Sequence, residues 1–372
     1  MMGLQFTRAD SMPVIRITDR KDHDISARFL APFREGVFLV VRLNSGNEVY
    51  LTQGYYYDFS DRKIHKINIP EITKIHSAVV AGQTAWFSGE TNGESQLIGI
   101  DKEGRIQLSL PEKEGIPQLG LNGQHLLIIY PDEVFRLEKG EWQRIYAGNI
   151  VLPRSGPPPK QFGDKLYFRD EGHGEDNKRL SWIDLKKPVV LHYLDEDVGL
   201  VGSSGPNWEN VPSYHVTEEG TLWAAVGRYG QSVLHRTANG KYSIATLNKS
   251  VRFTPDLRDS GRNDQGLFLS AVASDSGGRM LFVGGSGLYR LDGLQLKQEL
   301  AFTNASQKIP IKFNNRDSVL HWSWDPTQII TLQKDSYFIS GEFGGVYHLE
   351  RDTQGNWKIE SLDEELGHPV SW

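Results

Sequence analysis

One pattern recurs along the whole chain: a short strand, a polar turn and a second short strand. In its clearest copy, Ser274 to Leu300, Gly-rich turns bound the apolar run Met280 to Val283, and a further turn follows at Asp292 and Gly293. Segments this short, bounded by residues that permit positive φ, are predicted to be strands. The seven copies of the second hairpin begin at Tyr55, Leu97, Val134, Leu180, Val233, Leu288 and Val346.

An apolar segment precedes each hairpin. These segments read as continuous apolar runs, as expected of strands buried on both faces, whereas Lys63 to Ile69 alternates between Ile and polar residues like a half-solvated outer strand. The repeat length of roughly 37 to 58 residues brackets the value of about 40–50 for a four-stranded propeller blade. The apolar segments are Val37 to Val40, Thr84 to Phe87, Leu126 to Ile129, Leu166 to Phe168, Leu222 to Ala225, Leu281 to Val283 and Tyr337 to Ile339.

The repeat predicts an all-β fold, a seven-bladed β-propeller of four-stranded antiparallel blades. A large β-sandwich or two barrels would not produce seven copies of one hairpin. We expect a single domain over residues 1–372, with an N-terminal segment at 1–24 and the blades at 25–372. Because an open ring leaves two bare sheet edges, we expect Val14 to Thr18 to complete the last blade near Val346 to Leu362; the rival closing element is Pro369 to Trp372.

Composition excludes several classes of protein. The net charge of −6 argues against a nucleic-acid partner, because no basic patch large enough to release many counterions is apparent. The chain has no Cys, which excludes disulfides, thiolate metal sites and a Cys nucleophile. No segment has the pattern of a signal peptide or a membrane span. We therefore expect no membrane association and a cytoplasmic protein, or an extracytoplasmic one if an export signal was removed.

Residues Asp275 to Asp292, DSGGRMLFVGGSGLYRLD, contain an Asp/Gly turn, an apolar strand, a Gly-rich turn and a Leu-Tyr-Arg strand. This order resembles the short repeat of the two-component-regulator propellers. Glu218 to Ala225 matches the first half of that repeat and Tyr337 to Leu349 matches the second half. The resemblance covers the last three predicted blades and implies a propeller fold with a sensing or binding role. It transfers no functional residue.

Three long links between blades are the predicted location of a site: Asp195 to His215, Asn248 to Leu267 and Thr303 to Trp324. The second link is dense in opposite charges. It either binds a carboxylate or phosphate through guanidinium contacts or forms a self-satisfied ion-pair surface. Its charged residues are Arg252, Asp256, Arg258, Asp259, Arg262 and Asp264.

The third link has the mixture of amide, Arg and aromatic residues that sugar sites use, in Asn315, Arg316, His321 and Trp322. Trp322 and Trp324 are two positions apart, so on a strand both lie on one face and alternatively cap a blade core. Trp208, in the first link, either covers the channel mouth or belongs to an ordinary connection.

The acidic, Gly-rich turn around His173 invites a metal-binding interpretation, but it lacks the spacing of a calcium loop and its His is alone. We therefore expect no metal and no cofactor. Among the histidines, His173, His215 and His321 are expected near the channel. Four further histidines lie in hairpin strands, where packing or surface roles are the default: His65, His192, His235 and His348.

The sequence contains no sialidase-type Ser-x-Asp-x-Gly-x-Thr-Trp turn and no Gly-x-Ser-x-Gly nucleophile elbow. The favoured hypothesis is a non-catalytic module that binds a protein or glycan ligand on the long-loop face of blades four to seven. The alternative is a lyase or hydrolase acting on an acidic polysaccharide, with His321 or His173 as the acid or base beside Arg residues between Arg252 and Arg316.

Overall fold

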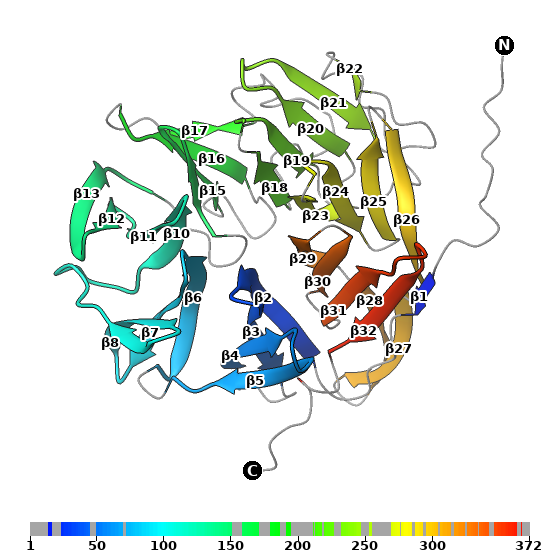
Figure 1. The fold of residues 1–372 in the computed structure, drawn as a ribbon, viewed down its shortest axis with the longest axis horizontal. Coiled ribbons are helices and arrows are strands. Elements are labelled where there is room, and N and C mark those ends of the chain that lie inside the picture. The colour runs from blue at the N-terminus through cyan, green and yellow to red at the C-terminus, as the bar shows by residue number, and fades with distance from the viewer. Residues whose placement is uncertain are drawn as a thin grey trace.

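The chain is built from β-strands (Figure 1). The computed structural model describes residues 14–16, 24–44, 50–69, 72–150, 158–170, 179–186, 191–194, 211, 213–217, 219–226, 232–246, 253–254, 269–275, 277–284, 287–292, 295–303, 306–313, 316–323, 326–333, 335–341, 346–362 and 366. Within these residues no helix has the length and apolar character needed to cross a bilayer.

Most strands fall into units of four consecutive antiparallel strands. The first units are β2 (Asp24–Phe33), β3 (Gly36–Asn44), β4 (Tyr50–Asp58) and β5 (Lys63–Ile67); β6 (Lys74–Ala81), β7 (Thr84–Thr91), β8 (Glu94–Asp101) and β9 (Gly104–Gln107); and β10 (Gln118–Asn122), β11 (His125–Ile129), β12 (Glu133–Glu138) and β13 (Glu141–Ala147). The later units are β14 (Lys160–Phe162), β15 (Lys165–Asp170), β16 (Arg179–Asp184) and β17 (Leu191–Tyr193); β18 (Ser213–Val216), β19 (Leu222–Val226), β20 (Ser232–Arg236) and β21 (Tyr242–Thr246); β23 (Leu269–Ser274), β24 (Met280–Gly284), β25 (Gly287–Asp292) and β26 (Gln295–Thr303); and β29 (Pro326–Gln333), β30 (Ser336–Gly341), β31 (Val346–Arg351) and β32 (Trp357–Ser361). These are the strands that the hairpin repeat predicts.

The units surround a central axis, with the first strand of each unit nearest the centre (Figure 1). First strands of successive units lie side by side from β2 through β6 and β10 to β14, and again from β18 through β23 and β29 back to β2. β10 and β14 also pair in parallel, which joins their two units into one eight-stranded sheet. Between β14 and β18 the units join through an apolar cluster that includes Tyr167, Trp182 and Tyr214. This arrangement is a β-propeller.

The second strands are buried on both faces, which explains their continuous apolar sequences. In β3, Phe38 and Val40 pack with residues of the β6–β9 unit, whereas Val37 and Leu39 pack with Phe338 of the β29–β32 unit. The same division between odd and even positions holds in β11, β19, β24 and β30. Each second strand therefore supplies apolar side chains to two neighbouring interfaces.

The prediction that an N-terminal strand completes the last blade is wrong. β1 (Val14–Arg16) pairs in parallel with β26, with Val14 opposite Ala301 and Arg16 opposite Thr303. The β29–β32 unit already has four strands from one continuous part of the chain, so it has no missing strand for β1 to supply. The rival closing element, residues 369–372, lies outside the described residues.

Side-chain packing joins the first unit to the last one instead. Tyr57 packs edge-on against Phe338, with ring centroids 5.4 Å apart, and its hydroxyl donates to Glu360 Oε2 at 3.1 Å. Leu30 N donates to Gln328 Oε1 at 2.7 Å. This seam buries the same kind of apolar core as the other interfaces between units.

Two of the predicted long links contain strands. The link from Asn248 to Leu267 includes β22 (Phe253–Thr254), which pairs with β21. The link from Thr303 to Trp324 is not an irregular loop: it holds β27 (Ser306–Phe313) and β28 (Arg316–Ser323), which form a separate two-stranded sheet. We call this element the β27–β28 hairpin.

A five-residue turn recurs in the last three units. Its first residue is Asp or Thr, whose N–H donates to the carbonyl of residue five and whose carbonyl accepts the N–H of a Gly at residue four. The first residue's side-chain oxygen also accepts the N–H of residue five. The copies are Thr217 to Thr221, Thr237 to Lys241, Asp275 to Arg279 and Asp352 to Asn356, with the Gly at φ between +75° and +87° in each.

Candidate functional site

Three of the residues predicted to bind ligand, Arg316, His321 and Trp322, lie on β28. In the hairpin register they stand opposite Phe313, Lys308 and Gln307 respectively. The others lie outside the described residues, so their grouping stays a prediction: His173, Trp208, Arg252, Arg258, Arg262, Asp264 and Asn315.

Arg316 and His321 do not share a face of the hairpin. They are five positions apart on β28, and the pairing with β27 is regular over its whole length. Since strand residues alternate between faces with a period of two, an odd separation assigns the two positions to opposite faces. The backbone thus does not favour Arg316 and His321 as partners in one catalytic pair.

The four hairpin histidines each stand opposite an aromatic residue on the adjacent strand. Three of the four rings stack on that partner, with centroids 4.1 to 5.5 Å apart. The three stacked rings have packing roles and His65 lies at the surface, in line with the packing or surface roles that the sequence favoured. The pairs are Tyr56 with His65, Trp182 with His192, Trp223 with His235 and Phe338 with His348.

Polar side chains on the first strands bond to the backbone of the neighbouring unit and so hold the wall of the central channel together. Each bond satisfies a backbone group that would otherwise need water. The pairs are Leu119 N to Ser77 Oγ (3.1 Å), Val272 N to Ser213 Oγ (3.2 Å), Leu30 N to Gln328 Oε1 (2.7 Å) and Thr331 Oγ1 to Ser274 O (2.7 Å).

In a second set of polar groups on the first strands, side chains interact with one another and not with the backbone. His215 Nε2 on β18 lies 3.1 Å from Ser274 Oγ on β23. Lys160, at the start of β14, is close enough to His215 for its charge to lower the pKa of the imidazole. We call Lys160, His215 and Ser274 the channel cluster, which draws one residue from each of three successive units.

Burial is the main cause of the low pKa of His215, which falls to about 4, and the positive charge of Lys160 adds to it. The imidazole is therefore neutral at pH 7. Lys160 keeps solvent contact, although desolvation by the surrounding protein lowers its pKa. Water therefore reaches the Lys160 ammonium, although protein surrounds it on several sides.

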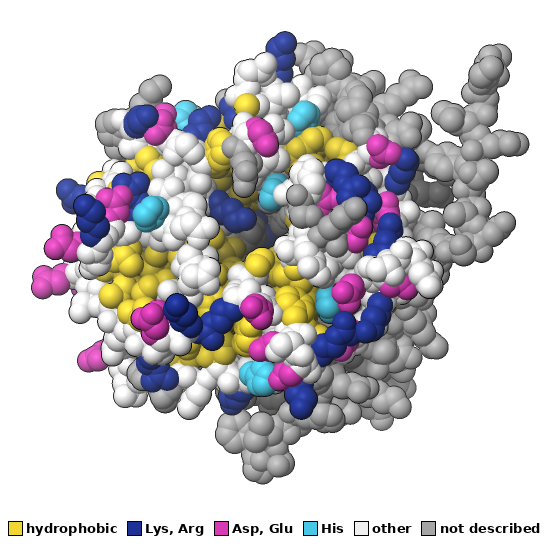
Figure 2. All heavy atoms as spheres, viewed as in Figure 1, with side chains coloured by type: hydrophobic (Ala, Val, Ile, Leu, Met, Phe, Trp, Pro, Cys, Tyr) yellow, Lys and Arg dark blue, Asp and Glu magenta, His cyan; other side chains and the backbone are white. Residues whose placement is uncertain are grey.

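The channel cluster lies at the end of the channel opposite the long links. In antiparallel units, the turn after each first strand lies at one end, here called the turn end, and the links between units lie at the other, the link end. Ser274 is the last residue of β23, and Lys160 is level with Leu121, close to the end of β10. Figure 2 shows Lys or Arg and His side chains around the hollowed middle of the ring.

Sequence reasoning expected His215 near the channel, and its position on β18 agrees. It missed Lys160 and Ser274, because their surroundings come from units far apart in the chain. It also placed the site at the link end, whereas the channel cluster lies at the turn end.

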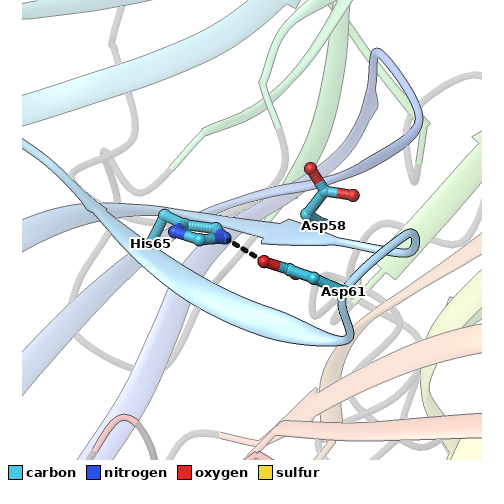
Figure 3. Close-up of side chains that lie close together, drawn as sticks. All are labelled: Asp58, Asp61 and His65. Carbon is cyan, nitrogen blue, oxygen red and sulfur yellow. Dashed lines mark hydrogen bonds and ion pairs between the residues drawn. The ribbon is translucent and has the colours of Figure 1, made fainter.

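A second group of ligand-type side chains lies on the turn between β4 and β5. Ligand atoms of Asp58, Asp61 and His65 fall within 4.8 Å of one another. His65 Nε2 faces Asp61 Oδ2 at 3.0 Å (Figure 3), and Asp58 Oδ1 accepts the N–H and hydroxyl of Ser60. Asp61 Oδ1 accepts the N–H of Lys63. The carboxylates thus order this exposed turn, as Asp commonly does.

Comparison with known proteins adds one structural likeness. No family model matches the chain, and no curated protein sequence matches it either. Among solved structures, the β-propeller domain of the Trilobed protease from Pyrococcus furiosus, described as having an open velcro topology, is similar with a TM-score of 0.45. The match has 13% sequence identity and covers 90% of this chain and 97% of that one.

Proposed function

We propose that this protein is a recognition module, a β-propeller that binds a protein or glycan ligand at its link end. The observation that carries the proposal is the β27–β28 hairpin, a two-stranded sheet separate from the four-stranded units. The units close the ring through their own packing, so the hairpin is not required for closure. It carries Arg316, His321 and Trp322, and Arg and Trp are residue types enriched at binding hot spots.

We propose further that the ring has seven blades and that the binding face extends over the links of units four to seven. In that face, the link residues from Arg252 to Asp264 supply charge and the hairpin supplies aromatic and amide groups. The recurring Asp/Thr-x-x-Gly-x turn of the last three units supports the proposed kinship with the two-component-regulator propellers, whose resemblance covers the same units.

Replacement of residues 305–324 by a short Gly-Ser linker tests the proposal. The wild type and the variant are compared on an array of neutral and acidic glycans and by cross-linking to proteins of the source cells. We expect the variant to keep the far-UV spectrum and cooperative unfolding of the wild type and to lose its ligands. Retention of every ligand by a folded variant contradicts a link-end site built on the hairpin.

An enzyme acting on an acidic polysaccharide is the second candidate. The observation that favours it is His215 beside Lys160, since an ammonium can hold the carboxylate of an acidic sugar and a neutral imidazole can accept a proton. The pKa of about 4 makes His215 a weak base until a bound carboxylate offsets the charge of Lys160. Incubation with acidic polysaccharides, followed by assay of new reducing ends and unsaturated uronates, tests this reading. Product formation that His215→Gln abolishes supports the enzyme, and the absence of products from every polysaccharide supports the recognition module.

A further inference from the structure

The channel cluster contains a cation without a counter-charge among the described residues. Lys160 forms no ion pair within that part of the chain. Three acidic groups in turns at the turn end are already paired: Asp164 with Lys186 (2.6 Å), Asp275 with Arg279 (2.7 Å) and Asp335 with Arg290 (2.9 Å). Lys160 is open to solvent, and the surrounding protein lowers its pKa, so an external anion is a natural partner for this ammonium.

Ser274 and His215, the other two residues of the channel cluster, supply a hydrogen-bond donor for an anion. Ser274 and His215 share one bond at 3.1 Å. When the Ser274 hydroxyl donates to Nε2, the proton of the neutral ring lies on Nδ1, which is then a donor; in the other tautomer the Ser274 hydroxyl keeps its own proton for a ligand. In both cases one N–H or O–H group of the pair is left to donate to an anion.

We propose that Lys160, His215 and Ser274 form an anion-binding subsite at the turn end of the central channel, which takes the carboxylate or phosphate group of a ligand. Lys160 supplies the charge, and the His215–Ser274 pair supplies a neutral donor. Charge-assisted hydrogen bonds to an anion are shorter and stronger than neutral ones. The subsite lies at the opposite end from the β27–β28 hairpin and does not depend on the function proposed for the link end.

Anion binding also changes the proton affinity of the cluster. A bound anion offsets the positive charge of Lys160, which is one of the two causes that lower the pKa of His215. It also interacts favourably with an imidazolium. The pKa of His215 therefore rises when the subsite is filled, and this rise is a local readout that a distant anion site would not produce.

The experiment compares the wild type with Lys160→Met and with Lys102→Met, a control in an exposed turn at the same end. Unfolding temperature is followed during titration with inorganic phosphate and, in a second arm, with citrate, at constant ionic strength. NMR of the His215 ring gives its pKa with and without each anion. The arms distinguish a phosphate ligand from a carboxylate ligand.

We expect at least one anion to stabilise the wild type and to raise the pKa of His215. Lys160→Met should weaken binding at least about tenfold, as loss of a charge-assisted contact predicts, and Lys102→Met should leave it unchanged. If Lys160→Met does not fold, Ser274→Ala takes its place in the comparison. Equal stabilisation of wild type and Lys160→Met, or an unchanged pKa of His215, would overturn the subsite. The variant in which a linker replaces residues 305–324 should still bind the anion.

Discussion

His215 differs from the other strand histidines in its surroundings. His235 stacks on Trp223 and His348 stacks on Phe338, so each imidazole acts as a flat ring in a cross-strand pair. His215 instead faces a hydroxyl and a nearby ammonium. A neutral His in this position contributes hydrogen bonding without charge, and protonation would place a second cation beside Lys160.

This arrangement makes stability depend on pH through His215. Its pKa is about 4 in the folded state and about 6.5 in the unfolded state. Between these values the unfolded chain binds more protons, so the free energy of unfolding decreases as pH falls through the window. The loss is complete below the folded pKa and amounts to no more than about 3 kcal/mol, because water reaches the channel.

His215→Gln removes this contribution. Urea unfolding of the wild type and the variant at pH 7, 6, 5 and 4 measures it. The difference between their free energies of unfolding should change steadily in favour of the variant as pH falls. His76, His235 and His348 also have lowered pKa values, and the subtraction cancels their effect. A difference that is independent of pH contradicts the low pKa.

At the scale of elements, the five-residue turn explains why the last three units are the easiest to recognise in the sequence. In its third copy, Asp275 Oδ1 accepts the N–H groups of Gly277 and Arg279 at 2.8 and 2.9 Å, and Asp275 itself is buried. Gly278 takes φ of +75°. The motif depends on an acceptor side chain at the first position and on a left-handed residue at the fourth.

Gly278→Ala should therefore destabilise the protein by about 1 kcal/mol, the cost of a left-handed conformation for a residue with a Cβ. No neighbouring atom lies within 4 Å of the added Cβ, so steric overlap does not contribute. Gly278→Asn is the matched control, because Asn tolerates this conformation better than Ala. Chemical denaturation measures both, and a larger loss for Asn than for Ala is inconsistent with this explanation.

The second strands could be predicted because they are apolar at both odd and even positions, a pattern that only burial on two faces produces. The β27–β28 hairpin was missed because Ser306 to Phe313 lies between two blades, where the repeat leads one to expect a connection. The partner of β1 was assigned wrongly because a three-residue strand has too little sequence to distinguish one exposed sheet edge from another. The channel cluster could not be predicted from the sequence, because its three residues come together only when the units assemble into a ring.

At the scale of the whole molecule, closure rests on side chains. Tyr57, Phe338, Val346 and Leu362 belong to one buried cluster that spans the first and last units. At its edge, Arg62 Nη2 lies 3.2 Å from Glu350 Oε2, an exposed pair that adds little by itself. No strand of the first unit enters the last sheet. Apolar side-chain packing therefore holds the first and last units together at this seam.

Two variants separate this form of closure from closure by an added strand. Removal of residues 1–23 deletes β1, whose three pairs with β26 lie away from the seam, and should lower the unfolding free energy by no more than about 1 kcal/mol. Phe338→Ala truncates a fully buried ring that contacts Tyr57 and stacks on His348, and should cost about 3–5 kcal/mol. Chemical denaturation compares the two, and small-angle scattering reports whether the ring stays compact. If the truncated protein expands while Phe338→Ala remains compact, β1 has a closing role that its pairing with β26 does not explain.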